Sequence, residues 1–210
     1  MDLECEVVLR EFMAGRRSEV GFPIETDDLT ILIEQYADLD SMADLSHEGL
    51  DVEGVTIFGH RPLVRISERL WDPRRENRLR TTLTHELGHV VFHNALWVER
   101  RNQMQFDFAV SPLESQCHRE SMVGSRSVDW MEWQAGYACG AFLMPYSALH
   151  ELVSSLRRGR SDVISSTFVP ALVEATRERF RVSEEAAQVR LAILGYGVEG
   201  QANPDFFPGT

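Results

Sequence analysis

The sequence predicts an α+β fold that is mainly helical, with a small β-sheet packed near one central helix. Two observations carry this prediction. Apolar residues recur at helical spacing over several stretches, and a strand–turn–strand pattern lies in the first third of the chain. Apolar residues fill 43% of the 210 positions, so the chain can bury a core of ordinary size.

We expect one domain over residues 1–200, followed by a loose tail over 198–210. Within this domain an N-terminal helical part comes first, then the small sheet with two central helices, and then a group of C-terminal helices. These three parts are predicted to span residues 1–50, 51–146 and 147–197. The N-terminal helices are expected to cover the sheet, and the C-terminal helices to brace the second central helix.

The elements before the central helix follow from apolar spacing. A helix is predicted from Asp27 or Asp28 to about Ala37, behind an acidic first turn. Residues 52–58 are typical of a strand, and the chain turns and returns through residues 63–66, which indicates a hairpin. We expect this hairpin to offer an edge strand on which an extended peptide can pair.

Two helices with a long connection between them occupy the middle of the chain. Asp72 is typical of a helix N-cap and precedes a proline, so the first helix begins there and is expected to end near Asn94. Residues 95–128 are polar and irregular, which predicts a functional or mobile loop. Asp129 can cap the second, strongly apolar helix, which stops at Pro145.

The last part of the chain predicts two or three short amphipathic helices between Ser147 and Leu194. Ser183 is expected to cap the last of them, and Gly195 to close it.

Charge and composition exclude several classes of function. The chain carries 33 acidic and 21 basic residues, a net charge of −12, so we expect no direct binding to nucleic acid or to a membrane. Lysine is absent, which excludes Schiff-base and lysine general-base chemistry. The three cysteines are an odd number, and the acidic first residues do not resemble a secretory signal. A cytoplasmic location is therefore expected.

Residues His85, Glu86 and His89 form an H-E-x-x-H pattern on the first central helix. Histidines four positions apart lie on one helix face and can share one metal ion, while the glutamate can act as a general base. Nitrogen ligands suit Zn²⁺, although such a site also accepts Mn²⁺ or Fe²⁺. The pattern predicts one Zn²⁺ per chain rather than a chance pair on a surface helix, because apolar residues flank it.

A third ligand must come from elsewhere, and Glu132 is the best placed residue. A metzincin would have a further histidine at position 95, which is Ala95. His93 lies eight residues after His85, about 12 Å along the helix, and we interpret it as a histidine favoured by the helix dipole. Glu132 opens the second helix, whose small residues permit a close approach. The alternative is that Glu132 forms a capping box with Asp129.

These residues lead to a family resemblance. H-E-L-G-H at residues 85–89, E-x-Q-A at 132–135 and A-F-L-M-P at 141–145 resemble the ImmA/IrrE family of zinc metallopeptidases. The closing helix at 182–195 is similar as well, so the resemblance covers roughly residues 52–195. It implies a zincin-like domain and a gluzincin-type site. In that site His85, His89 and Glu132 bind Zn²⁺, and Glu86 is the catalytic base.

Members of this family act on helix-turn-helix repressors, so the resemblance implies an endopeptidase that relieves transcriptional repression. The sequence before Asp27 is too short for a helix-turn-helix domain, and the target is therefore expected to be a separate protein. Two alternatives remain open. In the first, the chain is a zinc-containing regulatory module that binds a repressor or another partner without cutting it. In the second, it is a peptidase with a target other than a repressor.

One departure from the family pattern concerns the support of the metal ligands. The family commonly places Asn or Asp four residues after the ligand glutamate, where it orients the first histidine, but this chain has Gly136 there. Groups that orient ligands change zinc affinity by about 10–100-fold, so another residue takes this role or the site is weaker. Asp129 is one candidate for it.

Several further residues have two interpretations. Cys117 and His118 belong to a polar lid, or they supply a switchable fourth ligand. Tyr137 and Tyr146 are both candidates for stabilising an oxyanion. The aromatic residues near the start of the second helix, with Trp130 as the first, pack in the core or form a docking edge for substrate.

Overall fold

The computed structural model describes residues 1–14, 16, 21–49, 51–103, 114–118, 130–157 and 168–196. The chain divides into two compact units, one made of Met1–Ile24 with Gly140–Thr210 and the other of Glu25–Cys139. The structure is mainly helical with one small sheet, so the predicted α+β fold is confirmed. None of the helices in the described part of the chain is long and apolar enough to cross a lipid bilayer.

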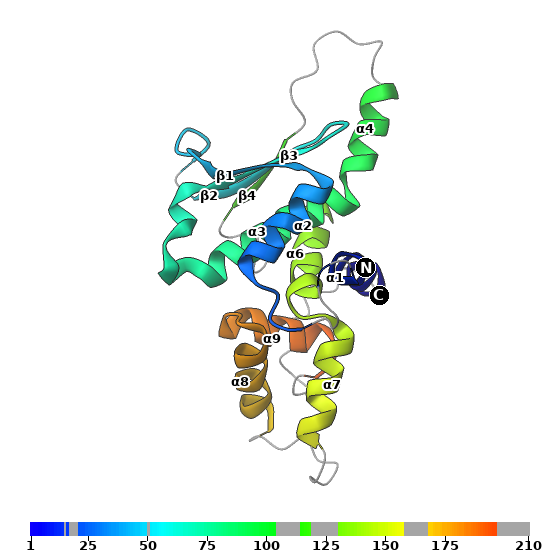
Figure 1. Cartoon of the computed structure of the whole chain (residues 1–210), viewed down its shortest axis with the longest axis vertical. Coiled ribbons are helices and arrows are strands. Elements are labelled where there is room, and N and C mark those ends of the chain that lie inside the picture. Colours follow the sequence, from blue (N-terminus) through cyan, green and yellow to red (C-terminus); the bar gives the residue numbers. More distant parts are fainter. Residues whose placement is uncertain are drawn as a thin grey trace. The chain divides into compact units, whose positions relative to one another are not determined.

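The unit Glu25–Cys139 is built around a four-stranded sheet with the strand order β1-β3-β2-β4 (Figure 1). β2 and β3 form the predicted antiparallel hairpin, β1 runs parallel to β3, and β4 runs antiparallel to β2. The strands are β1 (Asp38–Ala43), β2 (Val52–Ile57), β3 (Leu63–Ser67) and β4 (Glu114–His118). The prediction that the hairpin offers a free edge is wrong, because β1 and β4 pair with both of its outer sides.

Two helices of this unit pack against each other and lie beneath the sheet in Figure 1, α2 (Thr26–Tyr36) and α3 (Glu76–Phe92). Two short 3₁₀ turns, Glu68–Trp71 and Pro73–Arg75, lead into α3. The side chain of Asp72 accepts a hydrogen bond from the Arg74 amide at 2.9 Å and so caps the second of these turns, whereas α3 itself begins at Glu76 without a side-chain cap. α3 contacts β2, β3 and β4, and it therefore places the H-E-x-x-H residues under the middle of the sheet.

The predicted loop over 95–128 contains two elements, so that prediction is wrong in its described part. α4 (Asn94–Gln103) follows α3, and β4 adds to the sheet. α4 has few apolar residues, but its Trp97 stacks on Phe58 with ring centroids 5.7 Å apart. Tertiary contact and backbone pairing thus create elements that apolar spacing does not reveal.

The unit made of Met1–Ile24 and Gly140–Thr210 is helical in its described residues. α6 (Trp130–Leu143) begins in the other unit and ends in this one; the further helices are α1 (Asp2–Ala14), α7 (Tyr146–Arg157), α8 (Phe168–Phe180) and α9 (Glu184–Ile193). Ser183 caps α9 by accepting from the Ala186 amide, and Gly195 closes it with φ +74°, as predicted. The buried Arg190 donates to the Met144 carbonyl at 3.1 Å and pairs with Asp2 of α1.

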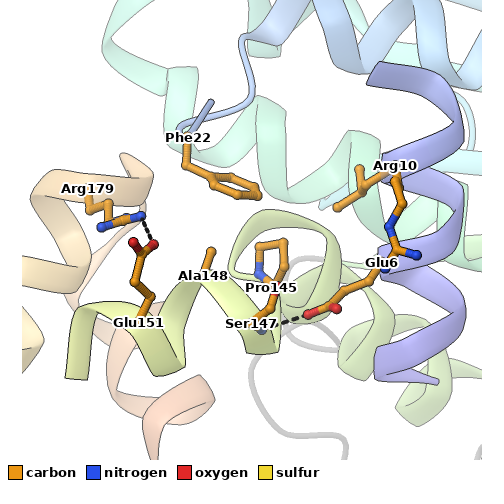
Figure 2. A pocket seen from close by; sticks show the side chains of 9 residues that line it. Glu6, Arg10, Phe22, Pro145, Ser147, Ala148, Glu151 and Arg179 are labelled. Atoms are coloured by element: carbon orange, nitrogen blue, oxygen red, sulfur yellow. Dashed lines mark hydrogen bonds and ion pairs between the residues drawn. The ribbon is translucent and has the colours of Figure 1, made fainter. Parts of the chain in front are cut away.

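This helical unit also contains a pocket of about 330 Å³, shown in Figure 2. Its two carboxylates have structural partners. Glu6 accepts a hydrogen bond from the Ser147 amide at 2.7 Å, and Glu151 pairs with Arg179 at 2.8 Å. The pocket residues include no histidine or cysteine, so the predicted metal chemistry lies elsewhere.

Candidate metal centre

Three side chains that are predicted metal ligands converge in the unit Glu25–Cys139. His85 and His89 extend from α3, and Glu132 extends from the first turn of α6. The two Nε2 atoms are 3.2 Å apart, and each lies 3.1 Å from one carboxylate oxygen of Glu132. The structure thus brings together residues that are 47 positions apart in sequence.

The approach of α6 to α3 depends on Gly88, which lies between the two histidines in sequence. A Cβ atom at Gly88 would lie 3.1 Å from Ala135 Cα and 3.1 Å from Ala138 Cβ, both on α6. These contacts are already tighter than ordinary van der Waals packing. Small residues on both helices therefore allow Glu132 to reach the histidines, as the sequence predicted for α6.

Burial sets the protonation of this cluster. His85 and His89 have no exposed surface, and the Glu132 side chain is 13% exposed. Burial, helped by the neighbouring His85, lowers the pKa of His89 to about 4. Burial alone would raise the pKa of Glu132, but its contacts with the His85 and His89 rings together lower it. At neutral pH a neutral His89 therefore faces a carboxylate, and these are the forms that bind metals.

The donor set and its dimensions fit Zn²⁺. A tetrahedral site with bonds of 2.0–2.1 Å separates neighbouring ligand atoms by about 3.3 Å. The Nε2 atoms of His85 and His89 are 3.2 Å apart, and each lies 3.1 Å from a different carboxylate oxygen of Glu132. Two nitrogens and one carboxylate leave a fourth position open, as in catalytic zinc sites. Asp129, the predicted capping partner of Glu132, lies outside the described residues.

Glu86, the predicted base, lies against the sheet. Its side chain is fully buried, and Oε2 accepts a hydrogen bond from the Thr56 hydroxyl of β2 at 2.5 Å. A Cβ atom at Gly54 on the same strand would lie 2.5 Å from Glu86 Oε1. Only glycine therefore leaves room for this carboxylate. Neither β2 residue was predicted from the sequence, although a glycine inside a strand is a known sign of close backbone approach.

His93 is the C-terminal cap residue of α3, which is the negative end of the helix dipole where the sequence interpretation placed it. Its side chain is also fully buried, and it has contacts that the sequence did not predict. His93 Nδ1 lies 3.0 Å from Nδ1 of His89, and His93 Nε2 lies 2.9 Å from Oε1 of Gln134 on α6. His93 and Gln134 therefore belong to the surroundings of the metal ligands, and Gln134 was not predicted.

His85 has no hydrogen-bonded neighbour comparable to the one that His93 provides for His89, within the described residues. Among the residues that the structure describes, Nδ1 of His85 has no hydrogen-bond partner. Gly136, where the family pattern has Asn or Asp, has nothing within 4 Å of an added Cβ. Cys117 and His118 belong to β4, and their side chains lie outside the description, so their role as lid or ligand remains a prediction.

The aromatic candidates make ring contacts of their own. Trp130 is 56% exposed and stacks on Trp133 with centroids 4.8 Å apart, which favours a surface role over core packing. Tyr137 lies 5.7 Å from the Trp133 ring. Tyr146 belongs to the other unit and stacks on His150 at 5.8 Å. The role of either tyrosine at an oxyanion remains a prediction.

A comparison with known families agrees with the resemblance drawn from the sequence. The model of the family described as Peptidase_M78, IrrE N-terminal-like domain, matches residues 114–192. The matched stretch includes Glu132 and most of α9, while residues 85–89 lie before it. No curated protein matches the sequence. The family match indicates a metallopeptidase-type domain.

Proposed function

From this similarity to ImmA/IrrE metallopeptidases, we propose that the chain is a zinc-dependent endopeptidase that cleaves a helix-turn-helix repressor and relieves repression. The observation that carries the proposal is the convergence of His85, His89 and Glu132, with ligand atoms within 4.8 Å of one another. The substrate is a separate protein in this proposal. The net charge of −12 disfavours direct contact with DNA.

The residues around the cluster have separate tasks in this reaction. His85, His89 and Glu132 would hold Zn²⁺, which supplies a Lewis acid and lowers the pKa of water. Glu86 takes a proton from the attacking water and delivers it to the departing amine. The Thr56 hydroxyl holds Oε2 of Glu86, and it therefore fixes the direction in which the base points.

The proposed docking site for the substrate is β4, the edge strand beside β2. β2 carries Gly54 and Thr56, which contact the base Glu86, and β4 pairs with β2 in antiparallel orientation. An extended peptide can add by backbone hydrogen bonding to the side of β4 that faces away from β2, where no strand pairs among the described residues. This assignment replaces the hairpin edge, which is occupied.

The first experiment is metal analysis of protein purified without added metal or a histidine tag. We expect about one Zn²⁺ per chain, which fits a single catalytic site. Manganese or iron in place of zinc would keep the peptidase and change its cofactor. Wild-type protein without any metal would remove the basis of the proposal.

The second experiment compares Glu86→Gln with wild type on candidate helix-turn-helix repressors, with cleavage followed by mass spectrometry. Glu86→Gln is expected to keep zinc and lose cleavage, because the amide cannot accept the proton. The matched control is Glu76→Gln at the exposed start of α3, which is expected to cleave like wild type.

A non-catalytic zinc module is the second candidate. The contact between Glu86 and Thr56 favours it, because it holds the carboxylate against the sheet. Such a module binds its partner and leaves it intact, and Glu86→Gln would bind equally well. Cleavage by wild type and none by Glu86→Gln would eliminate this candidate.

A further inference from the structure

Two side chains, those of His93 and Gln134, form a hydrogen-bonded chain behind one of the candidate metal ligands. His89 Nδ1 lies 3.0 Å from His93 Nδ1, and His93 Nε2 lies 2.9 Å from Gln134 Oε1. His93, one helical turn after His89 on α3, is completely buried, and Gln134 comes two residues after Glu132 on α6. The chain therefore connects both helices that supply the metal ligands.

The chemistry of the atoms fixes the direction of these hydrogen bonds. An amide oxygen only accepts, so His93 donates from Nε2 to Gln134 Oε1. A neutral His93 protonated at Nε2 has its lone pair at Nδ1, and His89 must then donate from its own Nδ1. His89 consequently keeps a lone pair at Nε2, the atom that faces His85 and Glu132.

The opposite direction is incompatible with a metal. If His93 donated from Nδ1, His89 would carry its proton at Nε2 and could not bind a cation there. In the direction that the Gln134 oxygen imposes, the Nε2 lone pair of His89 faces a Glu132 oxygen at 3.1 Å. A cation shared by these two atoms makes that arrangement favourable.

We propose that His93 and Gln134 are positioning residues that hold His89 in its metal-binding tautomer and orientation. The inference rests on the proposed zinc site and deepens it. Groups that accept a hydrogen bond from a ligating histidine orient the ring and raise metal affinity by about 10–100-fold. Here the acceptor is another histidine, which is itself fixed by an amide on the second helix.

The test measures the Zn²⁺ dissociation constant of the purified full-length chain by competition with a chromophoric chelator. Gln134→Met keeps the size of the side chain and removes the acceptor, and His93→Phe removes the link itself. We expect both to bind zinc about 10–100-fold more weakly than wild type. The Co²⁺-loaded variants are expected to show shifted d–d absorption bands, because His89 can turn.

Gln134→Glu is the conservative variant, since it keeps an oxygen acceptor facing His93. It is expected to bind zinc at least as tightly as wild type, and with a wild-type Co²⁺ spectrum. This variant keeps the test decisive if Gln134→Met or His93→Phe fails to fold.

A purely structural role predicts a different pattern, and Thr84→Val is the matched control. The Thr84 hydroxyl on α3 lies 3.2 Å from Cys139 Sγ on α6, so it links the same helices and makes no hydrogen bond to His85, His89 or Glu132 in the described contacts. It is expected to lower thermal stability and leave zinc affinity unchanged.

The outcomes separate this inference from the proposed function. Wild-type zinc affinity in both Gln134→Met and His93→Phe would overturn the positioning role and leave the zinc site intact. Equal losses of affinity in Thr84→Val and Gln134→Met would also overturn it, because any link between the helices would then suffice. A wild-type chain that binds neither Zn²⁺ nor Co²⁺ would overturn the proposed function together with the inference.

Discussion

The two histidines of the H-E-x-x-H pattern are equivalent in sequence but unequal in the folded chain. Both are fully buried, and both present Nε2 to Glu132. His89 is connected through His93 to Gln134, whereas Nδ1 of His85 has no hydrogen-bond partner within the described residues. The pattern on α3 thus supplies two candidate ligands, while a residue of α6 contributes to the hydrogen-bonded surroundings of one of them.

Two glycines show the same asymmetry in packing. Gly88 is pressed against Ala135 and Ala138 of α6, but an added Cβ at Gly136 would meet nothing within 4 Å. The side of the site near Gly88 is closed by backbone contact, and the position of Gly136 has spare room. We therefore expect a substitution at Gly88 to lower stability and zinc affinity. A substitution at Gly136 is expected to raise one of them.

The largest effect is expected from Glu132→Ala, which removes the residue common to both histidines. Zinc is expected to be lost, because two imidazoles alone do not complete a site. At free zinc 100-fold above the dissociation constant, wild type is stabilised by about 2.7 kcal/mol, and the variant loses this increment. Elemental analysis and thermal unfolding with and without chelator measure both effects. Zinc retained in Glu132→Ala would show that Glu132 is only a helix cap.

The next largest effect is expected from Gly88→Ala, because it disturbs the close contact between α3 and α6. The new methyl group would lie 3.1 Å from Ala135 Cα, where only backbone movement gives relief. Overpacking of this kind costs about 1–3 kcal/mol, and the displaced Glu132 is expected to weaken zinc binding too. Urea unfolding of the metal-free protein measures the first effect. Unchanged stability and unchanged zinc affinity would contradict the tight contact between the helices.

Gly136→Asp sharpens the comparison by giving His85 a partner. Position 136 lies one helical turn after Glu132, and it has room for a side chain. Zinc affinity is expected to rise by about 10-fold, since a carboxylate that accepts from Nδ1 orients the ring. Chelator competition gives the affinity, with Gly136→Ala as the control. An equal affinity for Asp and Ala at this position would place the open space away from His85.

The smallest effect is expected from Gly136→Ala. Replacing glycine inside a helix is worth about 1 kcal/mol when the new methyl group meets no neighbour. We therefore expect the free energy of unfolding to rise by up to about 1 kcal/mol, with zinc affinity unchanged. Chemical denaturation of the metal-free protein provides the measurement. A loss of stability would mean that the position is less open than the structure indicates.

The sequence predicted those elements whose local apolar pattern also determines how they pack in the folded chain. The helix that carries His85 and His89 and the hairpin before it have clear apolar spacing, and Glu132 was placed by the small residues that follow it. β4 and α4 were missed, because backbone pairing with β2 and the contact of Trp97 with Phe58 create them.

The side chains around the candidate ligands were harder to predict than the convergence of His85, His89 and Glu132. His93 lies too far from His85 to share one ion, so its distance argued against any role near the metal. Its link to Gln134 depends on the register between α3 and α6, which no pattern within either helix reveals. The same holds for Thr56, whose contact with Glu86 depends on how α3 crosses β2.

The contact of Glu86 with β2 has a consequence for motion. β2 is an inner strand, paired on both sides, and inner strands open only in rare, large fluctuations. A carboxylate anchored to such a strand moves on the timescale of the sheet rather than on that of the surrounding loops. The amide hydrogens of β2 are therefore expected to exchange slowly with solvent, and substrate must come to a base that stays in place.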